Sequence, residues 1–219
     1  MTRSDEAIDA VRDHRQNVVA RGYDALGVDY LSWASSFPDP ARQRLLSEFI
    51  TRLASGARVL DLGCGPGMPT TRVLAERFSV VGVDISETQL GAARRNVPEA
   101  SFIHADLALV DFPPECFDGV TAFYAISHVP RDEHGPLFER IHRWLVPGGL
   151  FLATLGARDE PAWIGDWLGH PMFFSSHDAN VNRGLLEAAN FDLLIDEVVD
   201  TPEPEGPVSF LWVLARRRT

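Results

Sequence analysis

Lysine is absent from the 219-residue chain, so all 20 of its basic residues are arginines. Without a lysine amine the chain cannot form a Schiff base with a carbonyl substrate, and every lysine-based catalytic scheme is excluded. Acidic residues number 31, and the formal net charge is −11. Because phosphate contacts require clustered positive charge, we predict no nucleic-acid partner.

Cysteine and long apolar runs are also scarce. Two cysteines cannot build a disulfide framework, which favours a reducing compartment. No stretch approaches the roughly 18 to 20 apolar residues of a membrane span, and the first residues are polar, without an apolar signal core. We therefore predict a cytoplasmic protein with no membrane partner.

The chain alternates strand-like and helix-like segments, which predicts a parallel sheet with helices on both faces. The expected strands cover 58–62, 79–84, 101–104, 117–124, 150–155, 192–200 and 207–215. The expected helices cover 5–21, 39–54, 68–77, 87–96, 132–145 and 178–190. The last two strands are expected to form an antiparallel hairpin at one edge of the sheet.

A glycine-rich turn follows the first buried strand. The segment from Asp61 to Gly67 places glycines at three alternate positions directly before a predicted helix. Glycine serves where the backbone turns at positive φ or where a ligand lies against bare main chain. The carboxylate of Asp61 at the mouth of this turn is unsuited to a phosphate and suits a ligand with a positive charge.

Two further strands also end in acids. Asp84 ends the second strand, where a carboxylate can accept hydrogen bonds from a ribose diol. Asp106 follows the third strand and could accept a hydrogen bond from an exocyclic amine such as that of adenine. Three carboxylates at one sheet edge, beside a glycine turn, describe a site for a cationic nucleoside.

These motifs, in this order, make the chain resemble the class I S-adenosylmethionine-dependent methyltransferases, in the type 11-like branch that acts on small molecules. The resemblance is carried by Asp61–Gly67, Asp84, Ala105-Asp106-Leu107, Phe117-Asp118-Gly119-Val120, Ser127-His128-Val129-Pro130 and Leu145-Val146-Pro147-Gly148-Gly149. It implies a doubly wound, mostly parallel, seven-stranded Rossmann-like α/β sheet with an antiparallel C-terminal edge strand and an N-terminal helical cap.

The resemblance implies that S-adenosylmethionine is the cofactor. Its methyl group would pass to a small-molecule acceptor by in-line displacement, releasing S-adenosylhomocysteine. Two alternatives stay open: a protein that binds this cofactor without transferring the methyl group, and a NAD-dependent oxidoreductase. The oxidoreductase pattern is G-x-G-x-x-G, whereas the chain has G-x-G-x-G preceded by an acid.

The resemblance also assigns cofactor contacts residue by residue. Asp61 supports the ammonium group directly or through water, Asp84 holds the ribose hydroxyls, and Asp106 binds the adenine amine. The full expected set is Tyr23, Tyr30, Asp61, Gly63, Cys64, Gly65, Gly67, Asp84, Ile85, Gln89, Asp106, Leu107, Phe123 and Tyr124. For Tyr23 and Tyr30, closure over the cofactor and simple packing of the cap remain equal alternatives, and Cys64 is expected to serve as a small residue of the turn.

Candidate general bases are His128, His170 and His177, and Tyr124 is a candidate catalytic residue that could orient an acceptor. The spacing of His128, Asp132 and His134 could suit a metal, but Pro130 argues against a shared helix face, so no metal is predicted.

We expect a single methyltransferase domain over 1–219. It would comprise a helical cap (1–54), a cofactor-binding core (55–155), a substrate lid (156–177) and a C-terminal helix with a hairpin (178–219). The lid segment is rich in aromatic residues, and the alternative is a helix packed on the core or on a second subunit. These aromatic residues favour a partly hydrophobic acceptor. The protein is expected to be a monomer or a homodimer.

Overall fold

The computed structural model describes residues 3–201 and 206–219. The helices are α1 (Arg3–Leu26), α2 (Asp29–Ser35), α3 (Pro40–Arg52), α4 (Thr70–Ala75), α5 (Glu87–Asn96), α6 (His134–Trp144) and α7 (Ala179–Ala188), with short 3₁₀ turns at Ile126–His128 and Arg131–Glu133. The strands are β1 (Arg58–Leu62), β2 (Ser79–Asp84), β3 (Ser101–His104), β4 (Phe117–Ala122), β5 (Leu145–Gly156), β6 (Glu160–Trp167), β7 (His170–Ser176), β8 (Phe191–Thr201) and β9 (Val208–Arg217).

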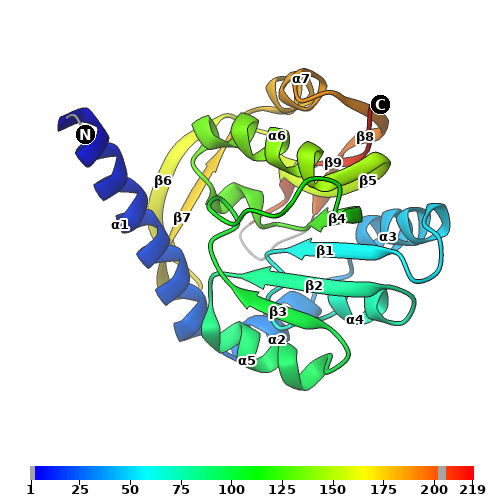
Figure 1. Cartoon of the computed structure of the whole chain (residues 1–219). Coiled ribbons are helices and arrows are strands. Elements are labelled where there is room, and N and C mark those ends of the chain that lie inside the picture. The colour runs from blue at the N-terminus through cyan, green and yellow to red at the C-terminus, as the bar shows by residue number, and fades with distance from the viewer. Residues whose placement is uncertain (1–2, 202–205) are drawn as a thin grey trace.

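Seven of these strands form one twisted sheet in the order β3-β2-β1-β4-β5-β9-β8 (Figure 1). Strands β1 to β5 are parallel, and β9 is antiparallel to both β5 and β8. The predicted fold class is therefore confirmed. The C-terminal hairpin lies at the edge as predicted, with β9 next to β5 and β8 as its outer strand.

Alternation along the strands feeds two hydrophobic cores, one on each face of the sheet. Successive strand residues point to opposite faces. Leu60 and Leu62 therefore join the core that α6 and α7 cover, whereas Val59 joins the core under α3 and α4. This two-sided burial holds the strands in register and fixes where each one ends.

Helix α1 and strands β6 and β7 stand outside these layers, across the carboxyl ends of the parallel strands (Figure 1). The segment 156–177 is neither irregular nor helical. It contains a two-stranded antiparallel sheet, β6–β7, whose tight turn has Leu168 and Gly169 at positive φ. The alternative of a helix in this segment is wrong. Gly22 of α1 lets β7 approach closely, because a Cβ there would lie 2.7 Å from the Met172 side chain.

Local interactions fix several helix ends. Ser86 caps α5, accepting from the Gln89 amide N–H at 3.1 Å. The Gln89 side chain donates through Nε2 to the carbonyl oxygens of Tyr23 and Gly27, and so anchors the end of α1. Asn190 adopts a left-handed conformation (φ 67°) just after α7, as residues that end helices often do.

Across residues 3–201 and 206–219, no helix combines the length and apolar character that crossing a membrane requires.

Gly119 in β4 offers a direct test of core packing. A Cβ at this position would lie 2.5 Å from Cζ of Phe49 on α3, so we expect Gly119→Ala to lower the free energy of unfolding by about 1–3 kcal/mol. Gly184 in α7 is the matched control, because nothing lies within 4 Å of its added Cβ. Gly184→Ala should raise stability by about 0.5–1 kcal/mol. Urea denaturation of both variants measures the difference, and equal stabilities would contradict this packing.

Candidate functional site

The glycine turn lies where β1 ends, and its shape depends on glycine. Gly63 and Gly65 have φ of 68° and 52°, and a Cβ on Gly63 would lie only 2.3 Å from the Ala125 Cβ. Asp84, at the end of β2, holds the turn in place through its carboxylate. Its Oδ2 accepts from the Gly65 N–H at 2.8 Å, and its Oδ1 accepts from the Ser86 N–H at 2.9 Å. Burial raises the pKa of the Asp84 carboxyl, so a cationic ligand nearby would stabilise its charged form.

Asp61 is buried beneath the turn and does not line a cavity. Its two oxygens accept hydrogen bonds from the hydroxyls of Thr71 (2.6 Å) and Thr121 (2.8 Å). Burial raises the pKa of this carboxyl to about 6, although both hydrogen bonds act in the opposite direction. The structure therefore gives Asp61 a direct part in holding β1, β4 and α4 together.

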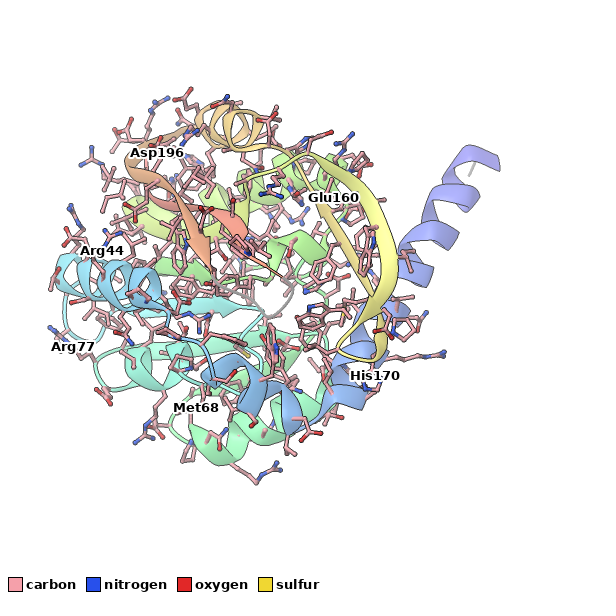
Figure 2. All side chains as sticks on the ribbon, turned by 180° about the vertical axis from the view of Figure 1, so that it is seen from behind. Arg44, Met68, Arg77, Glu160, His170 and Asp196 are labelled. Carbon is pink, nitrogen blue, oxygen red and sulfur yellow. The ribbon has the colours of Figure 1, made fainter. Side chains whose placement is uncertain are left out.

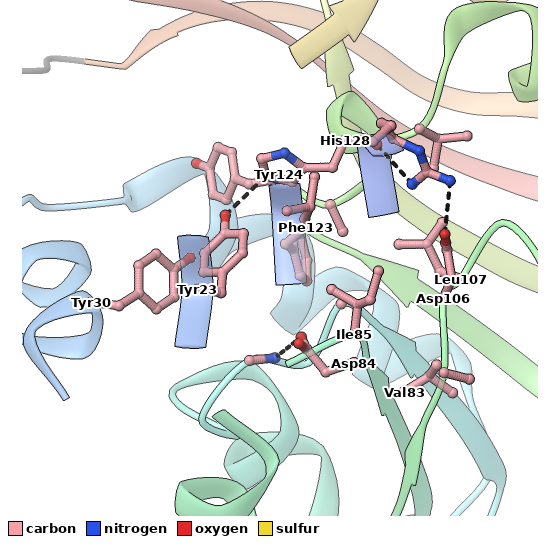
Figure 3. Close-up of a pocket in the computed structure, with 17 residues that line it drawn as sticks. Tyr23, Tyr30, Val83, Asp84, Ile85, Asp106, Leu107, Phe123, Tyr124 and His128 are labelled. Carbon is pink, nitrogen blue, oxygen red and sulfur yellow. Dashed lines mark hydrogen bonds and ion pairs between the residues drawn. The ribbon is translucent and has the colours of Figure 1, made fainter. Parts of the chain in front are cut away.

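Asp106 forms a buried ion pair that the sequence does not predict. Its Oδ2 accepts from Arg15 of α1 at 2.8 Å, and its Oδ1 accepts from the Ala108 N–H at 2.7 Å. Arg15 also donates to the His128 carbonyl oxygen at 3.1 Å (Figure 3). A helix from the first quarter of the chain thus supplies the cation for an acid at the sheet edge.

Two cavities meet at this edge. The inner cavity measures about 50 Å³ and is lined by the glycine turn, Asp84, Asp106 and Arg15. The outer cavity measures about 430 Å³ and lies beneath the β6–β7 hairpin and α2. Four residues line both cavities and are called the junction residues: Tyr23, Tyr30, Tyr124 and His128.

At the junction, hydrogen bonds fix the tautomer of His128. Its Nδ1 lies 2.8 Å from the Phe173 carbonyl oxygen of β7, and its Nε2 lies 2.9 Å from the Tyr23 hydroxyl (Figure 3). A carbonyl oxygen only accepts, so Nδ1 carries the proton and Nε2 accepts from the Tyr23 hydroxyl. Burial lowers the pKa of His128 to about 4, and the nearby Arg15 charge acts in the same direction. His128 is thus a neutral imidazole whose lone pair faces a phenol.

Tyr124 follows β4 in a left-handed conformation (φ 57°), which is costly for a bulky side chain. Its amide N–H donates to the Thr154 hydroxyl, and its own hydroxyl donates to Asp39 Oδ2 at 2.8 Å. Burial, followed by the Asp39 charge, raises the pKa of the Tyr124 phenol. This phenol is therefore a hydrogen-bond donor, and in this structure it donates to Asp39.

The structure brings most of the other predicted site residues together. Gly63, Gly65, Ile85, Leu107 and Phe123 line the inner cavity with Asp84 and Asp106. Four predicted contacts lie outside both linings: Asp61, Cys64, Gly67 and Gln89.

Two predicted bases lie away from both cavities. His170 stands at the tip of the β6–β7 hairpin beside α1 (Figure 2), and His177 bonds to the Arg131 carbonyl oxygen at 3.0 Å. In this arrangement neither histidine is positioned to accept a proton from a molecule in the outer cavity.

The outer cavity contains residues that the sequence reading missed. They include Trp33 of α2, Phe37 and Asp39 of the connection between α2 and α3, and Arg42 of α3. For Arg42 a signal existed. It lies three, four and seven residues before Leu45, Leu46 and Phe49, and so places a charge on the apolar face of α3.

No group of three or more potential metal ligands occurs in the part of the chain that the structure describes. His134, one of the three residues with ligand-like spacing, contacts the Val129 carbonyl oxygen at 3.0 Å through its Nε2.

The fold and the site define a class: a parallel sheet with one antiparallel strand, whose carboxyl edge carries a glycine turn flanked by acids. Residues 59–149 match the family described as methyltransferase domain. A trans-aconitate 2-methyltransferase from Variovorax paradoxus is 39% identical over 126 residues, covering 55% of this chain and 48% of the relative. A sterol 24-C-methyltransferase from Eremothecium gossypii is 29% identical over 185 residues, covering 74% of this chain and 47% of the relative. The chain thus spans about half the length of these curated relatives.

A solved structure gives the same fold over the whole chain. The 1,6-didemethyltoxoflavin-N1-methyltransferase of Burkholderia thailandensis has a TM-score of 0.68 at 22% identity, covering 100% of this chain and 92% of the other. The family match over 59–149 and these relatives support a class I S-adenosylmethionine-dependent methyltransferase of the type 11-like group, the family that the sequence predicts. The cofactor of this family is S-adenosylmethionine, as predicted.

The His128 tautomer can be tested by NMR. An imidazole with an ordinary pKa of 6.5 is mostly protonated at about pH 5, whereas His128, with a pKa of about 4, should remain neutral there. We expect its ¹⁵N shifts to show a protonated Nδ1 and a free Nε2, with His128→Gln used for the assignment. A titration midpoint near 6.5, or the opposite tautomer, would contradict the hydrogen bonds described above.

Proposed function

We propose that the chain transfers the methyl group of S-adenosylmethionine to a small, planar acceptor bound in the outer cavity. The observation that carries this proposal is the meeting of two cavities at the four junction residues. A methyl donor in the inner cavity and an acceptor in the outer one would face each other there. Alignment and exclusion of water are the main tasks of a protein when the electrophile is already reactive.

The inner cavity has the chemistry that the cofactor requires. The main chain is bare at Gly65, and the Asp84 carboxylate stands at the end of β2, where a ribose diol binds in such folds. Ile85 and Leu107 supply apolar surface for the adenine ring of the cofactor. When bound, the cofactor supplies a methyl group activated by a sulfonium.

Helix α1 forms one wall of the inner cavity, where Arg15 and Tyr23 line the space that we assign to the cofactor. Arg15 already donates a hydrogen bond to Oδ2 of Asp106, the residue to which we assign the adenine amine. In this proposal the guanidinium and the amine compete for one carboxylate, and α1 shifts when the amine binds.

The pair formed by Tyr23 and His128 supplies a route for the acceptor's proton. An acceptor hydroxyl or N–H at the junction would lose its proton to the Tyr23 oxygen while the Tyr23 hydroxyl proton passes to Nε2 of His128. The Phe173 carbonyl oxygen, which already accepts from Nδ1, would stabilise the resulting imidazolium. His128 is the only one of the predicted histidine bases that lines either cavity.

The relatives suggest which acceptors to try first. Trans-aconitate and 1,6-didemethyltoxoflavin are the acceptors named for two of the similar proteins. We expect S-adenosylhomocysteine to form with at least one planar acceptor. With that acceptor, Tyr23→Phe should lower kcat by about 10²- to 10⁴-fold, the usual contribution of acid–base catalysis.

Cofactor affinity is the control for this experiment. Tyr23→Phe should bind S-adenosylhomocysteine nearly as the parent does, because the ring remains. Binding of the cofactor without product across a broad acceptor panel would overturn the proposed transfer and favour a non-catalytic binding protein.

The role of Asp84 is tested separately. We expect Asp84→Ala to weaken S-adenosylhomocysteine binding by about 1–3 kcal/mol, the scale of a lost charged hydrogen bond. Asp118→Ala is the matched control: Asp118 also accepts from a main-chain N–H, that of Arg58 at 2.7 Å, but at the opposite end of the strands. Calorimetric titration gives both affinities. Unchanged affinity in a folded Asp84→Ala protein would remove Asp84 from the cofactor site.

A further inference from the structure

The outer cavity combines many aromatic residues with a smaller set of charged ones. Trp33, Trp167 and Phe174 form a continuous surface, in which the Trp33 and Trp167 ring centroids are 5.2 Å apart and those of Trp167 and Phe174 are 5.7 Å apart. The ionisable acids and arginines among the lining residues are Asp39, Arg42, Arg158, Glu160 and Asp166. Which of these charges can still bind a ligand determines the polarity of the acceptor.

Asp39 is already satisfied by the protein. Its Oδ1 accepts from the Arg42 amide N–H at 2.9 Å, which caps α3. Its Oδ2 accepts from the Tyr124 hydroxyl at 2.8 Å and lies 3.0 Å from Nε of Arg42. This carboxylate therefore braces the cavity wall and has little remaining capacity to bind a cationic acceptor.

The other acids and Arg158 lie at the exposed rim. Glu160, Asp166 and Arg158 are all exposed, and Asp166 accepts from the Gly169 N–H in the hairpin turn at 3.1 Å. Charges in high dielectric contribute little to the binding of a ligand deeper in the cavity.

Arg42 differs from these groups because its side chain is partly buried and its guanidinium is held in place. Its side chain is 18% exposed. The guanidinium carbon lies 5.0 Å from the Tyr124 ring centroid and 5.4 Å from that of Phe123. A guanidinium has five N–H donors, and one carboxylate at its edge does not use them all. A fixed, partly desolvated arginine in an aromatic cavity suits a planar oxygen anion.

An unpartnered polar atom of the cavity wall points to the same ligand. Nε1 of Trp33 is buried and, among the described residues, has no hydrogen-bond partner. Nε of Arg42, by contrast, is ion-paired with Asp39 Oδ2 at 3.0 Å. A buried donor without a partner is costly, and a ligand that accepts hydrogen bonds would satisfy it.

We propose that the methyl acceptor is a planar aromatic anion, such as an aromatic carboxylate, whose ring lies against Trp33 and Trp167 and whose oxygens bind Arg42. This inference rests on the proposed function and adds the charge of its substrate class. Arg42 is then the residue that determines specificity for the charged end of the acceptor.

Three indoles that differ only in their side-chain charge test the inference. Indole-3-acetate, 3-methylindole and tryptamine are titrated calorimetrically into the full chain saturated with S-adenosylhomocysteine. We expect indole-3-acetate to bind at least about tenfold more tightly than the other two, the scale of one charged hydrogen bond. Equal affinities, tighter binding of tryptamine, or no binding of indole-3-acetate up to its solubility would each overturn the inference.

Variants assign the preference to one residue. Arg42→Gln should remove the advantage of indole-3-acetate and leave 3-methylindole unchanged, whereas Arg42→Lys should keep part of it. The matched control is Arg44→Ala, which lies on the same helix but points outward to Glu197 (Figure 2) and should change nothing. If Arg42→Gln keeps the full preference, Arg42 is not the anion-binding residue.

A separate titration of S-adenosylhomocysteine distinguishes failure of the proposed function from failure of the acceptor class. If the parent protein does not bind S-adenosylhomocysteine, the proposed function fails. Intact cofactor binding without an anion preference would mean that only the acceptor class is wrong.

Discussion

The hydrogen bond between the Tyr23 hydroxyl and Nε2 of His128 joins residues 105 apart in the chain, and both of these residues line both cavities. His128 is fixed on its other side by the Phe173 carbonyl oxygen of β7. One imidazole therefore ties the N-terminal helix, the turn after β4 and the hairpin to one another. The next residues of α1 are fixed as well, because Asp24 accepts from the Ser86 hydroxyl (2.5 Å) and from the Thr88 N–H (3.1 Å) of the α5 N-terminus.

In this arrangement, helix α1 forms part of the wall of both cavities. Through Arg15 and Tyr23 it narrows the inner cavity, and through Tyr23 it also borders the outer one. A movement of α1 that admits a cofactor would therefore alter the acceptor side as well. Asp84 and the glycine turn, by contrast, are anchored to the parallel sheet, because main-chain hydrogen bonds hold them at the ends of buried strands.

The sheet and the cofactor side of the site could be predicted because their signals are local. Apolar strands ending in acids, and glycines where φ must be positive, recur in short segments such as 59–67. The ion pair of Arg15 with Asp106 could not be predicted, because it joins residues 91 apart and nothing in an arginine on a polar helix indicates its partner.

The hairpin was harder to predict for a different reason. The residues of β6 are mostly exposed, so the strand lacks the alternating burial pattern that strand prediction depends on. Arg42 was predictable in principle, as a charge on the apolar face of α3. Its role, however, depends on the rings of Phe123 and Tyr124, which both follow directly after β4.

Calorimetric titration of the full chain with S-adenosylmethionine, and in parallel with NADH, tests the central claim most directly. The arrangement of a glycine turn with Asp84 and Asp106 at one sheet edge predicts saturable, micromolar binding of S-adenosylmethionine and none of NADH. Binding of NADH alone would contradict the account, and the roles given to the glycine turn, Asp84 and Asp106 would then have to be reassigned.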